Sequence, residues 1–139
     1  MNNSIFPESM MSKSSSSEMT LEGIAEKFDY FFRQIHLLHL QTSSYAEHKA
    51  LQVWDTMPDQ KDEFLEKLMG YEGRKLRSYK ASPIIDYSMG LPKRILTDLR
   101  DFAEQLEDYA ESKNYSDIEN LAQSLSGSAS STLYLLTLS

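Results

Sequence analysis

The sequence predicts an all-α protein of four amphipathic helices behind an N-terminal tail. Apolar residues recur at positions i, i+3, i+4 and i+7 in four long segments, which is the spacing of one face of a helix. No segment has the alternating pattern that would predict a strand. A chain of 139 residues, 40% of them hydrophobic, suffices for one domain with a single core. We therefore expect a tail over residues 1–19 and one helical domain over residues 20–139.

Composition excludes several classes of partner. The formal net charge of -7 argues against nucleic acid and anionic lipid, because both are bound by clustered Lys and Arg. No apolar run approaches the roughly 18 to 20 residues that span a bilayer, so no membrane partner is expected. The chain has no cysteine, which excludes disulfides and fits a reducing compartment. The predicted location is the cytoplasm, meaning the host cytoplasm or the virion if the protein is phage-encoded.

The N-terminal tail is rich in serine, and residues 14–17 are all serine. Its few apolar residues cannot offset the entropy lost on ordering. Two interpretations stay open. The segment is either a plain tail or a docking peptide built around Ile5, Phe6 and Met10, which would become ordered on a protein partner.

The first helix follows Thr20, a residue type that caps helix N-termini by accepting a backbone hydrogen bond. Glu22 falls in the first turn, where negative charge suits the helix dipole. Residues 42–44 then break the pattern. The predicted buried stripe consists of Leu21, Ile24, Ala25, Phe28, Phe31, Phe32, Ile35, Leu38 and His39.

The second helix is predicted over residues 45–77, with Pro58 near its middle. Proline removes an intrahelical donor and clashes with the preceding turn. We therefore expect either a kink or break near Thr56 and Met57, or a new helix opening at Pro58.

Residues 78–91 contain Pro83 and Gly90 and lack a long helical period, so they are predicted to form a connection with at most a short helical turn. A connection of this length would let the chain cross from one end of a bundle to the other.

The third and fourth helices have clear start signals. Pro92 favours the first helical position, and Ser116 with Glu119 predicts a capping box for the fourth helix. The third stripe comprises Ile95, Leu96, Leu99, Phe102, Ala103, Leu106 and Tyr109. The fourth comprises Ile118, Leu121, Ala122, Leu125, Ala129, Leu133 and Leu136.

A metal site is suggested by His48, Asp62 and Glu66, which share one face of an ideal second helix. The helical rise would separate His48 from Asp62 by roughly 21 Å, too far for one metal. Two copies packed antiparallel near Asp55 would instead bring His48 of one copy to the two carboxylates of the other. Such ligands suit Fe(II), Zn or Mn. The alternative is an ordinary solvated helix face.

The order of these elements resembles the Dps-like mini-ferritins, in a short phage-type branch, over residues 20–138. The resemblance rests on an aromatic-rich first helix and on His39-Leu40-Gln41-Thr42, Ser44 to Leu51, and Asp62-x-x-x-Glu66 followed by Gly70. It implies a ferritin-like four-helix bundle with a long crossover connection between helices two and three, and a homo-oligomer with a two-fold interface on helix two. It further implies Fe(II) oxidation at sites shared between subunits, with the metal ligands His39, His48, Asp62 and Glu66.

The chain departs from that family at two positions. Gln52 stands where the family places a carboxylate, and Leu40 stands where it places a tryptophan. Two functions from different classes therefore remain. One is a ferritin-like oligomer that binds iron or a similar divalent metal. The other is a non-enzymatic structural or assembly protein, for instance a phage virion or accessory component, which uses the bundle as a scaffold and the tail for docking.

Overall fold

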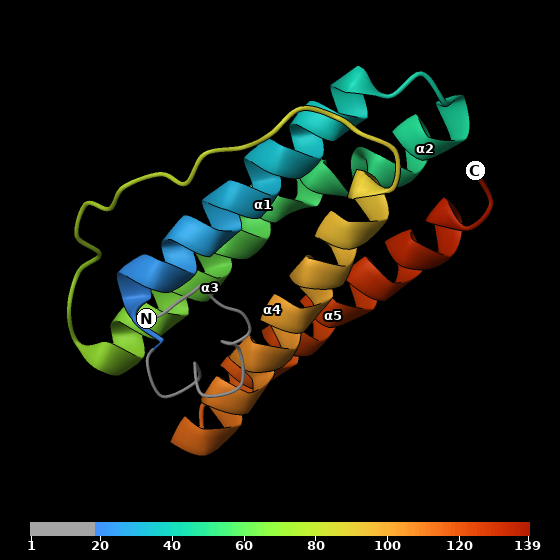
Figure 1. Ribbon diagram of the computed structural model, residues 1–139. Helices are drawn as coiled ribbons and strands as arrows, with labels where there is room; N and C mark the ends of the chain where they lie inside the picture. Colours follow the sequence, from blue (N-terminus) through green and yellow to red (C-terminus); the bar gives the residue numbers. More distant parts are fainter. Residues whose placement is uncertain (1–18) are drawn as a thin grey trace, which may run out of the picture.

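The computed structural model describes residues 19–139, and within that range the chain is helical and contains no strand (Figure 1). The predicted all-α class is confirmed. The expected tail lies outside the described residues except for Met19, which packs against the core. The four long helices are α1 (Leu21–Gln41), α3 (Met57–Glu72), α4 (Leu91–Lys113) and α5 (Ser116–Leu136). Two short helices, α2 (Tyr45–Ala50) and the 3₁₀ helix η2 (Leu51–Thr56), lie between α1 and α3.

The start of α1 is set by the predicted cap. The hydroxyl of Thr20 accepts a hydrogen bond of 3.0 Å from the backbone N–H of Gly23. The predicted break after Gln41 is also confirmed. Ser44 then caps α2 in the same way, accepting from the N–H of Glu47 at 3.1 Å.

The prediction of one helix over residues 45–77 is wrong, because the chain forms α2, η2 and a separate α3. Pro58 lies in the first turn of α3. There its missing N–H costs nothing. The expected break near Thr56 and Met57 is confirmed, because η2 ends at Thr56 and α3 begins at Met57 as a new helix. The helix ends at Glu72 because Gly73 adopts a left-handed conformation with φ 69° and its N–H bonds to the carbonyl of Met69.

The predicted capping box of the last helix does not form. The N-cap of α5 is Tyr115, with no side-chain cap, and the carboxylate of Asp117 instead accepts from the N–H of Ile118 at 3.0 Å. Asn114 closes α4 at φ 62°, which makes the turn between α4 and α5 tight and leaves Ser116 already inside the helix.

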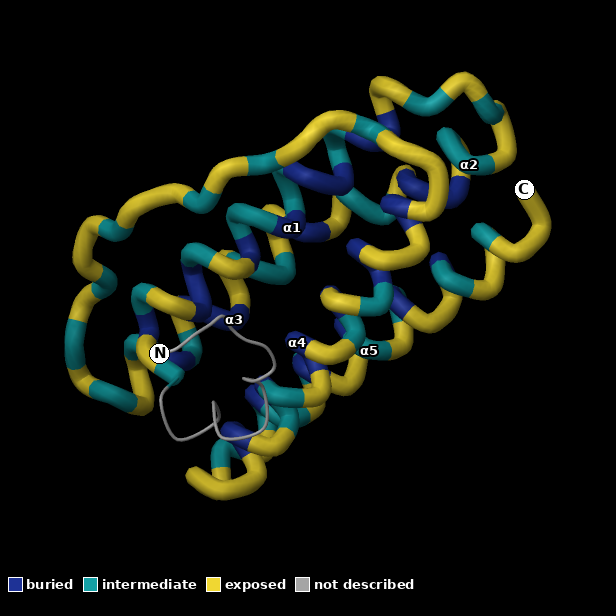
Figure 2. Tube along the Cα trace, in the orientation of Figure 1, coloured by how far each residue is buried: buried dark blue, intermediate teal, exposed yellow. Residues whose placement is uncertain are grey.

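The long helices bury most of their predicted stripes in one core, and Figure 2 shows buried residues recurring along each of them. Phe28 of α1 lies at its centre, with its ring centroid 5.5 Å from those of Phe64 and Phe102. Among the helix pairs, α4 and α5 pack against each other most extensively. Every predicted core position of α4 is buried, whereas Leu121, Leu133 and Leu136 of α5 are only partly buried.

Residues 73–90, here called the strap, connect α3 to α4 without a helix and lie along α1 (Figure 1). The strap starts beside the first turn of α1, where Arg74 contacts Glu22. It ends beside the last residue of α1, where Gln41 accepts from the N–H of Tyr87 at 2.7 Å. The predicted crossing from one end of the bundle to the other is therefore what the chain does.

Candidate functional site

Two of the predicted site residues form a stacked histidine pair. The rings of His39 on α1 and His48 on α2 have centroids 3.8 Å apart and planes 21° apart. The Nδ1 of each ring lies 2.8 Å from the backbone carbonyl oxygen of the other residue. A carbonyl only accepts, so each Nδ1 carries a proton and donates it. In the neutral ring the lone pair is then left on Nε2, the nitrogen a metal would need.

A second aromatic pair extends this cluster. His36, one turn before His39 on α1, stacks on Trp54 of η2 with centroids 3.9 Å apart and planes 23° apart. The indole Nε1 of Trp54 is buried and has no acceptor among residues 19–139. The cluster forms because residues 42–44 turn the chain back sharply, which brings α2 and η2 against the end of α1.

The two predicted carboxylate ligands lie elsewhere. Asp62 and Glu66 are exposed on α3. They would share a face with His48 only on one continuous α-helix, and η2, with about three residues per turn, breaks that register. Glu66 borders a surface hollow of about 500 Å³ together with the cationic Arg74 and Lys75.

Within the described range, no group of three or more His, Asp or Glu side chains is arranged to hold a metal ion. One chain therefore joins His39 to His48 and does not bring Asp62 or Glu66 to them. A site shared between two copies stays a prediction, because it would need side chains of the second copy.

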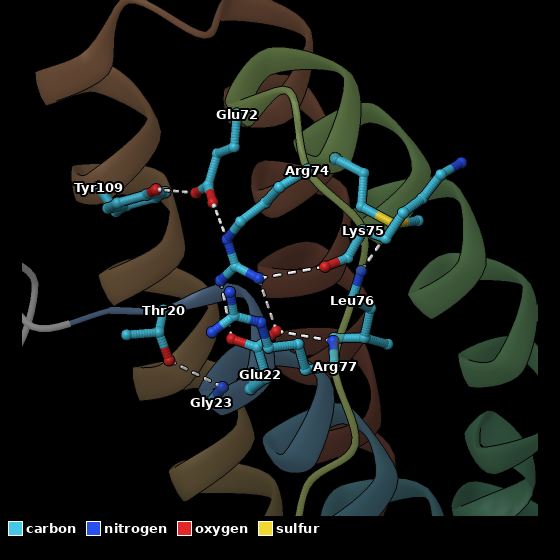
Figure 3. A network of polar contacts seen from close by, with 10 residues as sticks. Thr20, Glu22, Gly23, Glu72, Arg74, Lys75, Leu76, Arg77 and Tyr109 are labelled. Carbon is cyan, nitrogen blue, oxygen red and sulfur yellow. Dashed lines mark hydrogen bonds and ion pairs between the residues drawn. The ribbon is translucent and has the colours of Figure 1, made fainter.

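Polar residues of α1 bind the strap, a role that the sequence did not predict for them. Glu22 accepts from both terminal nitrogens of Arg74, at 2.8 and 2.7 Å, and from the N–H of Arg77 at 2.9 Å (Figure 3). These hydrogen bonds lower the pKa of the Glu22 carboxyl to about 2, and those from Arg74 have the largest effect. Arg74 also reaches Glu72 at 3.5 Å, and the Tyr109 hydroxyl donates to that carboxylate, which ties the strap to α3 and α4.

Further along α1 the same polar face continues. Asp29 pairs with Lys61 of α3 at 2.7 Å and accepts from the hydroxyl of Tyr79. The amide of Gln34, wholly buried, bonds both the N–H and the carbonyl of Ile85 at 2.9 Å. The helical spacing of its polar residues could have predicted this face from the sequence. These residues are Glu22, Glu26, Asp29, Arg33, Gln34 and Gln41.

The last turns of α1 and α5 and the first turns of α2 and α4 lie at one end of the bundle (Figure 1), and these segments carry exposed large apolar residues. The hydroxyl of Tyr87 donates to Glu47 at 2.6 Å and so fixes the end of the strap beside α2. Met89 is 95% exposed and Tyr45 is 75% exposed. We call this surface the apolar end; it comprises Leu40, Tyr45, Met89, Tyr134 and Leu138.

Comparison with known proteins assigns the chain to a family. A family model described as a family of unknown function (DUF5856) matches residues 39–136, more than half of the chain. The chain belongs to the DUF5856 family. It is also similar to an uncharacterized 14.6 kDa protein in the mobD-ri intergenic region of Enterobacteria phage T4, with 46% identity over 41 residues. That match covers 29% of this chain and 32% of the phage protein. No solved structure matches this DUF5856 protein.

The predicted membership of the Dps-like mini-ferritins is wrong, because the matching family is DUF5856 and no ferritin-like or Dps family is found. The features that suggested the resemblance were amphipathic stripes with His and acidic residues at helical spacings. Such features arise in any charged helical bundle, so they do not specify one family.

None of the helices within residues 19–139 has the length and apolarity to cross a membrane.

Proposed function

We propose that this protein is a non-enzymatic assembly protein that forms homo-oligomers through its apolar end. The observation that carries the proposal is the gathering of Leu40, Tyr45, Met89, Tyr134 and Leu138 at one end of the bundle, although they come from four separate parts of the chain. Exposed large apolar residues grouped at one end of a small protein are typical of a protein contact site.

The face of α3 fits a two-fold interface less well. Its exposed side chains include Asp59, Asp62, Glu63 and Glu66. Two identical copies that packed antiparallel on this face would bring acidic residues against acidic residues, which repel. We therefore place the interface at the apolar end rather than on helix two. The similarity to a phage T4 protein supports a phage origin, which would make the host cytoplasm or the virion the place of assembly.

The proposal is tested by the mass of the protein in solution, measured by light scattering after gel filtration. The wild type should have a mass above 16.0 kDa, the mass of one chain. Tyr134→Ser combined with Leu138→Ser should return it to the mass of one chain, because the apolar contact is lost. The matched control is Ile85→Ser, an exposed apolar residue of the strap away from this end, which should behave as wild type. An equal effect of the control and the double variant would contradict the proposal.

A second candidate function is divalent metal binding, with Fe(II) as the ion to test and its oxidation as the activity. The observation that favours it is the histidine pair, whose Nδ1 protons are held by carbonyl oxygens so that both Nε2 atoms carry lone pairs. The proposed ligands are His39 and His48 of one copy with Asp62 and Glu66 of another. Anaerobic Fe(II) titration should show saturable binding that His48→Ala with Asp62→Ala abolishes, and no saturation in wild type would exclude it.

A further inference from the structure

Two tyrosine rings lie face to face at the end of the bundle where α3 ends and α5 begins, opposite the apolar end (Figure 1). Tyr71 is in the last turn of α3, and Tyr115 is the residue directly before α5. Their ring centroids are 3.9 Å apart and their planes are 15° apart. The pair is distant from the histidine pair as well, so neither proposed function uses it.

Tyr71 is hydrogen-bonded to a proton acceptor. Its hydroxyl donates to the carboxylate of Asp117, in the first turn of α5, at 2.5 Å. This hydrogen bond is the main cause of a raised pKa of Tyr71 and of a lowered pKa of Asp117. The proton therefore rests on the phenol at neutral pH, and the carboxylate is charged and able to accept it. A phenol that loses an electron becomes a strong acid, so a base already in contact with its proton favours the oxidation.

The same ring is within reach of an oxidant from solution, because Tyr71 is 45% exposed. Tyr115 is partly buried and packs against the core beneath it. The ring of Tyr109 is also near Tyr115, but it is buried, edge-on at 77° and 6.4 Å away. Within residues 19–139, no other two tyrosine rings are stacked face to face.

A covalent bond between these rings would join α3 to α5. The chain has no cysteine, so a disulfide cannot make such a link. We propose that Tyr71 and Tyr115 form a dityrosine cross-link when a haem peroxidase and hydrogen peroxide act as the oxidant. This modification site goes beyond both proposed functions and does not depend on them.

The reaction removes one electron and one proton from each phenol. The proton of Tyr71 passes to Asp117, and the proton of Tyr115 passes to water. The two phenoxyl radicals then join through a new carbon–carbon bond between ring carbons next to the hydroxyl groups. The hydrogens on these two carbons move to the oxygens and restore both phenols. One hydrogen peroxide takes up the two electrons and two protons and becomes two molecules of water.

The test is to treat the full chain with a haem peroxidase and limiting hydrogen peroxide, and to follow dityrosine fluorescence. On a denaturing gel the main fluorescent product should run at the mass of one chain, 16.0 kDa. Mass spectrometry of its peptides should show Tyr71 linked to Tyr115 with the loss of two hydrogen atoms. The melting temperature of this product should rise by about 10 °C, because the cross-link restricts the unfolded chain.

Variants separate this pair from the other tyrosines. Tyr71→Phe and Tyr115→Phe should each abolish the product, whereas Tyr45→Phe, which removes a tyrosine that is 75% exposed at the apolar end, should leave its yield unchanged. Asp117→Asn should slow its formation at least about tenfold, because the proton acceptor is lost. The matched control is Glu119→Gln, which removes another carboxylate of the first turn of α5 and should not change the rate.

The proposal is overturned if no dityrosine forms, if the bond joins other tyrosines, or if the only fluorescent product has twice the mass of one chain. It is also overturned if Tyr71→Phe leaves the yield unchanged. Equal rates for Asp117→Asn and Glu119→Gln would contradict the role of the carboxylate. Tyr71→Phe and Tyr115→Phe are independent, so failure of one to fold leaves the other as the test.

Discussion

At the scale of single residues, Glu22 is the side chain with the most consequence for pH. Its carboxylate binds the start of the strap by accepting hydrogen bonds from Arg74 and from the N–H of Arg77. These contacts lower its pKa to about 2 from an ordinary value of 4.5. A carboxyl group with a lowered folded pKa adds stability above its unfolded pKa and loses it as the pH falls toward the folded value. The stabilisation should therefore be complete at pH 7 and disappear between about pH 4.5 and pH 2.

The variant Glu22→Gln tests this. Its free energy of unfolding in urea should be lower than that of wild type at pH 7, and the two should converge as the pH falls toward 2. The matched control is Glu104→Gln on the exposed face of α4, which should leave stability close to wild type at each pH. A difference between Glu22→Gln and wild type that persists unchanged at low pH would contradict the assignment.

Gln34 is the second residue whose role depends on the strap. Its buried amide bonds both backbone groups of Ile85, as a neighbouring strand would. Gln34→Met keeps the length of the side chain but leaves those groups unpaired, and should lower the free energy of unfolding by about 1 to 3 kcal/mol. Gln123→Met, on the exposed face of α5, should change it by less than about 0.5 kcal/mol. Similar losses for both would show that the amide pairing does not matter.

At the scale of elements, the end of α3 depends on the left-handed Gly73. A Cβ at this position would meet no atom within 4 Å, so the cost of a side chain comes from the backbone conformation alone. Gly73→Ala should destabilise the fold by about 1 to 2 kcal/mol.

Gly70, inside the same helix, is equally open. Gly70→Ala should therefore stabilise the protein, by about 0.5 to 1 kcal/mol, because alanine favours the helical conformation. Thermal unfolding of the two variants should shift in opposite directions. A loss of stability in both would mean that crowding, not φ, limits these positions.

The elements also show where sequence reasoning succeeds. Periodicity predicted α1 and α4 with their buried faces, because one side of each packs on the core and the other is polar. The hydroxyl side chain of Thr20, directly before the apolar stripe, predicted the N-terminal cap of α1. The segment after Ser44 failed because the change from α2 to η2 depends on packing against α1, which a one-dimensional pattern does not contain.

The site was less predictable than the fold, for the same reason. The sequence places His39 and His48 nine residues apart, but the reciprocal bonds between their rings and backbones depend on the angle between α1 and α2. The strap contacts join residues about 50 positions apart, as Glu22 with Arg74 does, so only the spacing of the polar face could indicate them.

At the scale of the whole molecule, α1 is covered on two sides, by the core and by the strap, so only part of its surface is exposed to solvent. The apolar side of α1 faces the core, and the polar side of α1 is hydrogen-bonded to residues of the strap. Five of the exposed large apolar residues, Leu40, Tyr45, Met89, Tyr134 and Leu138, lie on the segments that meet at one end of the bundle. This arrangement is the basis for the proposal that the protein acts by assembly, in a family whose function is unknown.

The most direct test of that proposal is sedimentation velocity of the wild-type chain from about 1 to about 100 μM, the range in which a weak dimer with a Kd near 10 μM dissociates. The proposal predicts a species heavier than 16.0 kDa whose share rises with concentration and falls in the Tyr134→Ser, Leu138→Ser variant. A single species of 16.0 kDa at every concentration would contradict it.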